Sequence, residues 1–214
     1  MRFIFSIILL LITLGCSNSK KTTSELNFEG IEGKEEFSST SYITAGDRVY
    51  AIGAQNGSFP EIGWHIQDEM GGVWNHPIKL LDGFKAIIKT DDSSKELVDA
   101  SFINYPYGNK LIYELERLNL LVEQFQFSPD QHQGLVLEYT ITNKSTLPFN
   151  GKLEFQSSFD LRPTWLGERS NMIDGEDIVE FSDNENTISA KDNKNNWFSL
   201  ISSSEDLLNS KRIL

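Results

Sequence analysis

The chain has 214 residues, with 31 acidic and 19 basic side chains, a formal net charge of −12 and a single cysteine. Its aromatic content of 11% excludes a disordered acidic tail, and the single thiol excludes an intrachain disulfide or a cysteine zinc cluster. The acidic balance argues against nucleic acid, whose phosphates require a basic surface, and favours a neutral or cationic small molecule or another protein as partner.

The first fifteen residues have the pattern of a signal peptide. Arg2 supplies a positive start, and the twelve residues from Phe3 to Leu14 carry no charge. Twelve residues at helical rise span about 18 Å, well short of a bilayer core of about 30 Å. The segment 1–15 is therefore predicted to be a secretory signal rather than a membrane-spanning helix.

The only cysteine, Cys16, directly follows this apolar run and Gly15. A small residue followed by cysteine at this point resembles the lipobox of bacterial lipoproteins, in which the cysteine is acylated. We expect a lipid anchor in the bacterial cell envelope, because two or three acyl chains on one residue bind a membrane stably. Lys20 and Lys21 give no acidic signal for surface export, which favours the periplasmic side. The alternative is an ordinary secretory signal with an unrelated cysteine.

The mature chain divides into a tether and a body of strands. Residues 16–41 are rich in Ser, Lys, Glu and Gly and are predicted to be flexible. In residues 42–204 the dominant period is two, which is the period of a β-strand. Strands are expected at 48–53, 84–90, 97–103, 111–117, 118–127, 135–141, 153–161, 178–181, 187–190 and 197–202. Many short strands without a sustained helical pattern predict one all-β domain, a two-sheet antiparallel β-sandwich, before a short C-terminal tail at 205–214.

The segment 53–83 departs from this alternation. It contains six of the fifteen glycines, two of the four tryptophans and two of the three histidines. Because glycine lets the backbone approach closely or adopt positive φ, this density predicts a shaped, irregular loop, and binding residues concentrate on such loops. Indoles offer flat faces to sugar rings, and acidic and histidine side chains hydrogen-bond hydroxyl groups. The candidates for contact with carbohydrate or with another domain are Trp64, His65, Glu69, Trp74, His76 and Asp82. The alternative is that the tryptophans pack inward and the histidines bind local carbonyls.

Two blocks of sequence resemble bacterial glycogen-debranching-enzyme-like glycoside hydrolases. The motifs that carry the resemblance are GWH at 63–65, EMGGVW at 69–74, HPIKL at 76–80, FDLRPTW at 159–165 and DGED at 174–177. In that group a β-sandwich precedes an (α/α)6-barrel catalytic domain. The resemblance therefore implies a sandwich fold and an α-glucan or oligosaccharide ligand.

The barrel of that group carries its acid and base carboxylates, and this chain reaches Leu214 without an equivalent segment. We therefore expect a truncated or split product, or a sandwich that works alone. The leading hypothesis is a lipid-anchored domain that binds or positions α-glucan without catalysis. One alternative is an interaction module that docks onto a separately encoded (α/α)6 domain. A second alternative is a small hydrolase that uses loop carboxylates such as Glu69 and Asp82.

Two further expectations follow from the same residues. His65, Asp68 and Glu69 lack a second anchoring histidine or cysteine nearby, so no metal site is predicted, and no motif indicates a cofactor. In the group that the chain resembles, part of the sandwich packs against the barrel. Without that cover, we expect the isolated mature chain to self-associate through exposed apolar surface and strand edges.

Overall fold

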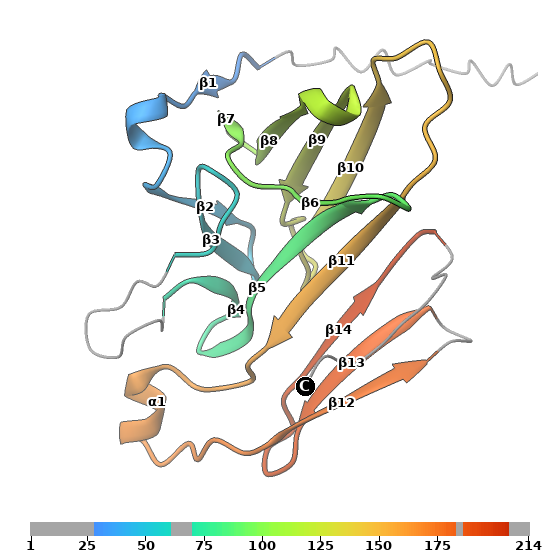
Figure 1. The fold of residues 1–214 in the computed structure, drawn as a ribbon. Helices are drawn as coiled ribbons and strands as arrows, with labels where there is room; N and C mark the ends of the chain where they lie inside the picture. The colour runs from blue at the N-terminus through green and yellow to red at the C-terminus, as the bar shows by residue number, and fades with distance from the viewer. Residues whose placement is uncertain (1–27, 61–69, 183–185, 206–214) are drawn as a thin grey trace, which may run out of the picture.

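The computed structural model describes residues 28–60, 70–182 and 186–205 of the chain (Figure 1). Within these ranges the protein consists of three antiparallel β-sheets joined by turns and short helices. The predicted all-β class is confirmed. The prediction of two sheets is corrected to three, because the last three strands pair only with one another and form a sheet of their own.

Sheet A forms one layer of the molecule. Its strands, in spatial order, are β1 (Ile31–Glu32), β7 (Ser101–Tyr105), β8 (Gly108–Leu115), β9 (Leu120–Phe127) and β10 (Val136–Asn143). The 3₁₀ turn η2 (Glu116–Leu118) joins β8 to β9. β1 pairs with β7 within the range predicted as tether, and the 3₁₀ turn η1 (Glu35–Phe37) follows it.

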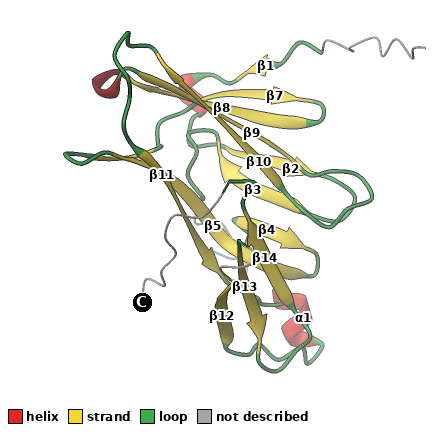
Figure 2. Ribbon diagram, turned by 90° about the vertical axis from the view of Figure 1, so that its right-hand side faces the viewer, coloured by secondary structure: helices red, strands yellow, loops and turns green. Residues whose placement is uncertain are grey.

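Sheet B faces sheet A. Its strands, in spatial order, are β11 (Lys152–Phe159), β5 (Ile78–Lys89), β4 (Gly72–Asn75), β3 (Tyr50–Ala54) and β2 (Ser41–Ala45), and β6 (Ser94–Glu96) also pairs with β5. Sheet C contains β12 (Asp177–Ser182), β13 (Thr187–Asp192) and β14 (Phe198–Ser202). Sheet C and the short helix α1 (Trp165–Arg169) lie at the same end of the molecule (Figure 2).

The main core lies between sheets A and B. Its buried members come from both layers: Tyr42, Ala86, Ile88, Leu97, Phe102, Leu111, Tyr113, Leu115, Leu120 and Val122. Full burial of each valine, leucine, isoleucine or phenylalanine among them contributes about 1.5–3 kcal/mol of hydrophobic stabilisation. A second cluster in sheet B is built around Val73, Leu81 and Phe84, and Ile201 of sheet C packs against it. Sheet C is therefore attached to the rest of the fold through apolar contact.

A buried polar layer also links the two sheets. The side-chain amide of Gln126, on β9, donates hydrogen bonds to Tyr42 Oη over 2.7 Å and to Thr44 Oγ1 over 2.8 Å, both on β2. Gln124 donates to Gln126 Oε1 over 3.2 Å. Because a buried amide without partners is costly, this network favours one register of sheet A against sheet B.

Part of the segment predicted as an irregular loop is strand. Residues 72–75 form β4, and β5 begins at Ile78. Gly72 has φ +102°, and a Cβ at this position would lie 2.1 Å from the carbonyl oxygen of Leu81. The pairing of β4 with β5 shifts register between Val73 and Trp74. The glycine here thus permits a β-bulge with a close backbone approach, rather than a loop.

Candidate functional site

The predicted contact residues do not form one open surface in the described part of the chain. Trp64, His65 and Glu69 lie outside the described residues. Trp74 is 3% exposed, and its indole N–H donates to the carbonyl oxygen of Met70 over 3.1 Å. The Trp74 ring therefore offers no face to solvent. His76 is exposed in the turn between β4 and β5.

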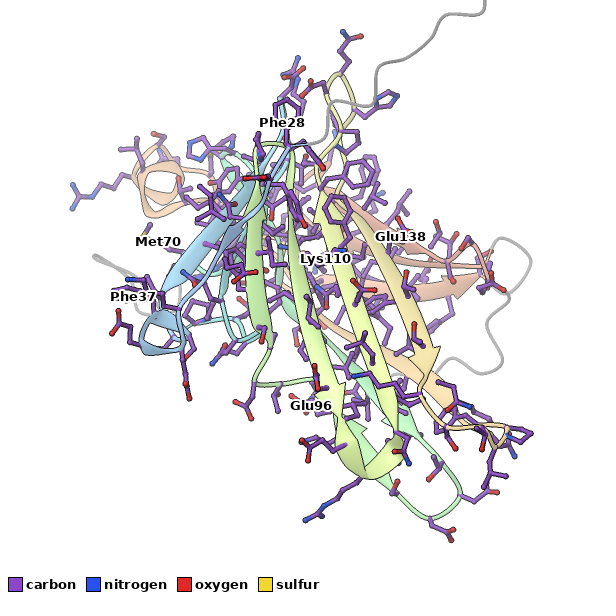
Figure 3. All side chains as sticks on the ribbon, turned by 90° about the horizontal axis from the view of Figure 1, so that it is seen from above. Phe28, Phe37, Met70, Glu96, Lys110 and Glu138 are labelled. Carbon is purple, nitrogen blue, oxygen red and sulfur yellow. The ribbon has the colours of Figure 1, made fainter. Side chains whose placement is uncertain are left out.

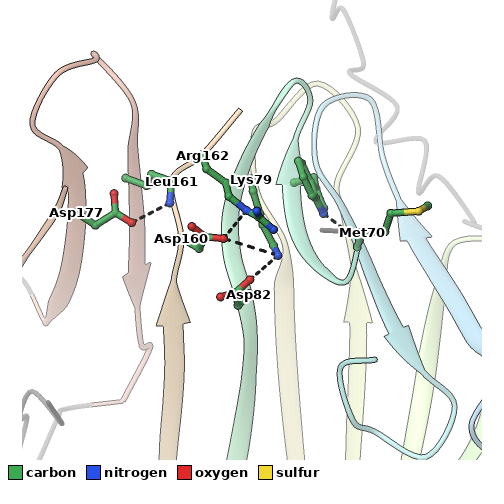
Figure 4. Close-up of polar contacts among 8 residues, drawn as sticks. Met70, Lys79, Asp82, Asp160, Leu161, Arg162 and Asp177 are labelled. Carbon is green, nitrogen blue, oxygen red and sulfur yellow. Dashed lines mark hydrogen bonds and ion pairs between the residues drawn. The ribbon is translucent and has the colours of Figure 1, made fainter. Parts of the chain in front are cut away.

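The sixth predicted residue, Asp82, belongs to a cluster of four charges centred on Lys79 (Figure 4). The side chain of Lys79 is 1% exposed, and its ammonium contacts the carboxylate of Asp82 and lies 3.8 Å from Asp160 Oδ2. Arg162 Nε lies 2.7 Å from the same Asp160 oxygen. Two cations and two carboxylates thus alternate, which offsets the cost of removing the Lys79 ammonium from water.

Backbone contacts bring the two blocks of the sequence resemblance together at this cluster. The Lys79 N–H donates to the carbonyl oxygen of Arg162 over 2.8 Å, and the Thr164 N–H donates to that of Pro77 over 3.0 Å. Asp177 accepts a hydrogen bond from the Leu161 N–H over 2.8 Å. The HPIKL, FDLRPTW and DGED motifs therefore meet at one junction between sheets B and C.

The environment of Asp160 raises the pKa of its carboxyl from 3.8 to about 6. Burial is the largest cause, the neighbouring Asp82 carboxylate adds to it, and Arg162 and Lys79 oppose it. Glycoside hydrolysis needs two carboxyl groups that flank one bond, roughly 5–9.5 Å apart with space between them. Here Asp82 and Asp160 are hydrogen-bonded neighbours and the Lys79 ammonium contacts both, so the cluster has the features of a structural junction rather than of a hydrolytic centre.

A different surface has the features of a binding site: a hollow of about 570 Å³ on the outer face of sheet A (Figure 3). Aromatic and charged side chains from four strands and from the segment before β1 line it. The lining residues are Phe28, Glu29, Gly30, Tyr105, Tyr107, Lys110, Glu123, Phe125, Glu138 and Thr140. We call this surface the sheet A groove.

Strand register explains why these side chains meet. Lys110 on β8 is the partner of Phe125 on β9, and Phe125 is the partner of Glu138 on β10. Two residues further along these strands, on the same face, Glu123 on β9 is the partner of Thr140 on β10. Because residues two apart share a face of a strand, the floor of the sheet A groove alternates aromatic and polar groups.

The aromatic rings of the groove form a platform. The Tyr105 and Tyr107 rings stack with centroids 5.7 Å apart, and the Phe125 ring lies 6.2 Å from Tyr105 and 6.0 Å from Tyr107. The Phe28 ring lies 6.1 Å from Tyr107. Rings at these distances contact one another, so they leave no cage between them for a cation. Tyr107 is 54% exposed and presents its ring to a ligand from outside.

A glycine makes room for this platform. A Cβ on Gly108 would lie 2.9 Å from Cζ of Phe125 and 2.5 Å from the carbonyl oxygen of Gln126. Any larger residue at this position would displace the Phe125 ring or separate β8 from β9. The two-residue turn of Pro106 and Tyr107 then carries the exposed tyrosine to the rim.

The charged residues of the groove differ in whether they form an ion pair within it. Lys110 Nζ donates to Glu123 Oε1 over 3.0 Å, and this hydrogen bond is the main cause that raises the pKa of Lys110. Lys110 therefore remains a cation that Glu123 already holds. Among the residues that the structure describes, Glu138 makes no ion pair.

Known proteins give no family for this chain, and its described residues give no metal site and no membrane-spanning helix. No protein-family model matches the chain, and no curated protein matches it significantly. In the described ranges, no group of three or more His, Cys, Asp or Glu side chains is placed to hold a metal ion. None of the helices there is long and apolar enough to cross a membrane. The candidate site therefore depends on the geometry of the sheet A groove.

Proposed function

We propose that the chain is a lipid-anchored carbohydrate-binding domain of the bacterial cell envelope. In this proposal it is a β-sandwich of the glycogen-debranching glycoside hydrolase type, and it holds or positions α-glucan. The observation that carries the proposal is the sheet A groove, which combines an exposed aromatic platform with hydrogen-bonding side chains on rigid strands.

Sugar chemistry fits this groove. A pyranose ring has apolar C–H faces that pack on aromatic rings, and its hydroxyl groups bind carboxylates and ammonium groups at its edge. Tyr107 and Tyr105 supply the first kind of contact, while Lys110, Glu123 and Thr140 supply the second. Ligand sites typically combine apolar surface with a few convergent polar groups in this way.

Calorimetric titration of the mature chain with maltoheptaose tests the binding. We expect Tyr107→Ala to weaken binding about tenfold, or about 1.4 kcal/mol, because it removes the most exposed ring of the platform. Phe37→Ala is the matched control, since Phe37 is 48% exposed but lies on η1, outside the groove lining. Unchanged affinity in Tyr107→Ala, or no binding by the wild type, would refute the proposal.

The anchor has a separate test, because Cys16 lies outside the described residues. Expressed with its signal segment in a bacterial host, the wild type should fractionate with membranes and incorporate labelled fatty acid. Cys16→Ser should remove the label and release the protein to the soluble fraction, because the acylated side chain is absent. Membrane association that survives Cys16→Ser would contradict lipid anchoring.

An exposed face of sheet C favours a second function, docking onto a separately encoded (α/α)6 domain. Ile178, Phe198 and Leu200 are 49%, 63% and 60% exposed and share the outer face of this sheet. Co-expression with a barrel domain encoded immediately downstream should restore glucan hydrolysis, and Phe198→Ser should weaken that effect. No observation favours the small-hydrolase alternative, since Asp82 contacts Lys79 and Glu69 lies outside the described residues.

A further inference from the structure

The sheet A groove is acidic beside its aromatic platform. Its lining contains the carboxylates of Glu29, Glu123 and Glu138 and one ammonium, that of Lys110. The Lys110–Glu123 pair is local, with a 3.0 Å contact and both side chains 30% exposed. Because Lys110 and Glu123 neutralise each other, Glu29 and Glu138 give the lining a net charge of −2.

Glu138 is the carboxylate best placed to act on a bound ligand. It stands on β10, directly opposite Phe125 of the platform, and its side chain lies on the outer face of sheet A (Figure 3). The lining cation Lys110, on β8, flanks Phe125 on its other side, but its ammonium is already held by Glu123. A ligand that stacks on the rings therefore lies within the range over which Glu138 repels negative charge, since the screening length is about 10 Å at 0.1 M salt.

We propose that the sheet A groove selects neutral glycans and rejects glycans that carry carboxylate, phosphate or sulfate groups, with Glu138 as the specificity-determining residue. This inference rests on the proposed carbohydrate-binding function. Hydroxyl groups of a neutral sugar donate hydrogen bonds to Glu138, whereas an anionic substituent meets a like charge without a free cation in the lining. Repulsion of the wrong ligand is a common source of specificity.

The test compares a neutral ligand with an anionic one of the same chain length. These are maltoheptaose and C6-oxidised maltoheptaose, in which carboxylates replace the C6 hydroxymethyl groups, and the salt dependence separates the effect of charge from the loss of a hydroxyl donor. In 20 mM NaCl the wild type should bind the neutral ligand about tenfold more tightly, and 500 mM NaCl should reduce this ratio because salt screens the repulsion. Glu138→Gln should narrow the ratio, and Glu138→Lys should abolish or reverse it, chiefly through tighter binding of the oxidised ligand.

Glu116→Lys is the matched control, because it makes the same charge change on η2 outside the groove lining. It should keep the wild-type ratio, which separates a local effect of Glu138 from the net charge of the protein. If Glu138→Lys still binds maltoheptaose but keeps the wild-type ratio, the inference is wrong and the binding function stands. Equal affinity of the wild type for the two ligands would likewise refute the inference and leave the binding function standing. If the wild type binds neither ligand, the proposed function falls and the inference falls with it.

Discussion

The N–H of Lys79 donates a hydrogen bond to the carbonyl oxygen of Arg162 over 2.8 Å, although the two residues are far apart in the sequence. Their side chains meet again through Asp160, which contacts both cations. Backbone and charge thus join β5 to the segment that leads from β11 to α1. This double connection holds the segment HPIKL at 76–80 against the segment FDLRPTW at 159–165.

Replacing the central cation should destabilise this junction. In Lys79→Met, Asp82 and Asp160 lose the ammonium that contacts both of them, but the cost of burying a charge is removed as well. We therefore expect the free energy of unfolding to fall by about 2 kcal/mol, less than for a fully buried pair, because the side chain of Asp82 is 51% exposed. Urea denaturation measures this change.

A second lysine on the same strand is the control for that variant. Lys85 is 47% exposed and lies 3.3 Å from Glu96, so Lys85→Met should change stability by no more than about 0.5 kcal/mol. Equal effects of the two substitutions would show that the buried position of Lys79 has no special importance.

The raised pKa of Asp160 should make stability depend on pH. Because the folded-state pKa is about 6 and the unfolded value is 3.8, the folded protein binds more protons between these values. Its stability contribution therefore decreases as pH rises from about 4 to about 6 and is constant above that range. Asp160→Asn should remove this slope relative to the wild type, whereas Asp92→Asn, in the exposed β5–β6 turn, should retain it. Parallel pH profiles for the wild type and Asp160→Asn would contradict the assignment.

Gly72, beside the bulge between β4 and β5, should not tolerate a side chain. Gly72→Ala places a Cβ against the Leu81 carbonyl at φ +102°, so we expect a loss of at least about 2 kcal/mol in the free energy of unfolding. Gly134→Ala is the control, because a Cβ there meets nothing within 4 Å. Thermal or urea unfolding distinguishes the two, and a stable Gly72→Ala protein would show that the bulge does not need glycine.

The alternation of residues predicts most strands but not the faces that they bury. The expected strand at 178–181 lies within β12, and the one at 197–202 matches β14 closely. In β9, however, the buried residues include Gln124 and Gln126, while Phe125 faces outward. A hydropathy pattern assigns the phenylalanine to the core, because it contains no information about the polar network across the sheets. The hydropathy pattern therefore does not reveal the sheet A groove, and Tyr107 in the turn between β7 and β8 is its only local signal in the sequence.

The glycine-rich segment shows a second limit of sequence reasoning. Glycine permits both loops and close strand pairing, and only the pairing with β5 decides that Gly72 lies in a strand beside a bulge. Similarly, a tryptophan suits a sugar site or a core. The choice for Trp74 depends on Met70, Tyr50 and Lys79, which surround its ring once the strands have paired. Such contacts are tertiary, and residue type alone does not contain them.

The exposed apolar residues on the outer face of sheet C should drive self-association of the isolated mature chain. Phe198 and Leu200 alternate on β14, and Lys191 separates Ile178 from Phe198 in one row. The double substitution Phe198→Ser and Leu200→Ser should keep the protein monomeric at concentrations where the wild type associates in sedimentation velocity experiments. Leu147→Ser is the control, since Leu147 is 72% exposed in a turn outside this face, and it should leave association unchanged. A wild type that remains monomeric at high concentration would contradict the prediction, because its apolar face would then be too small or too well separated by Lys191 to bind a second copy.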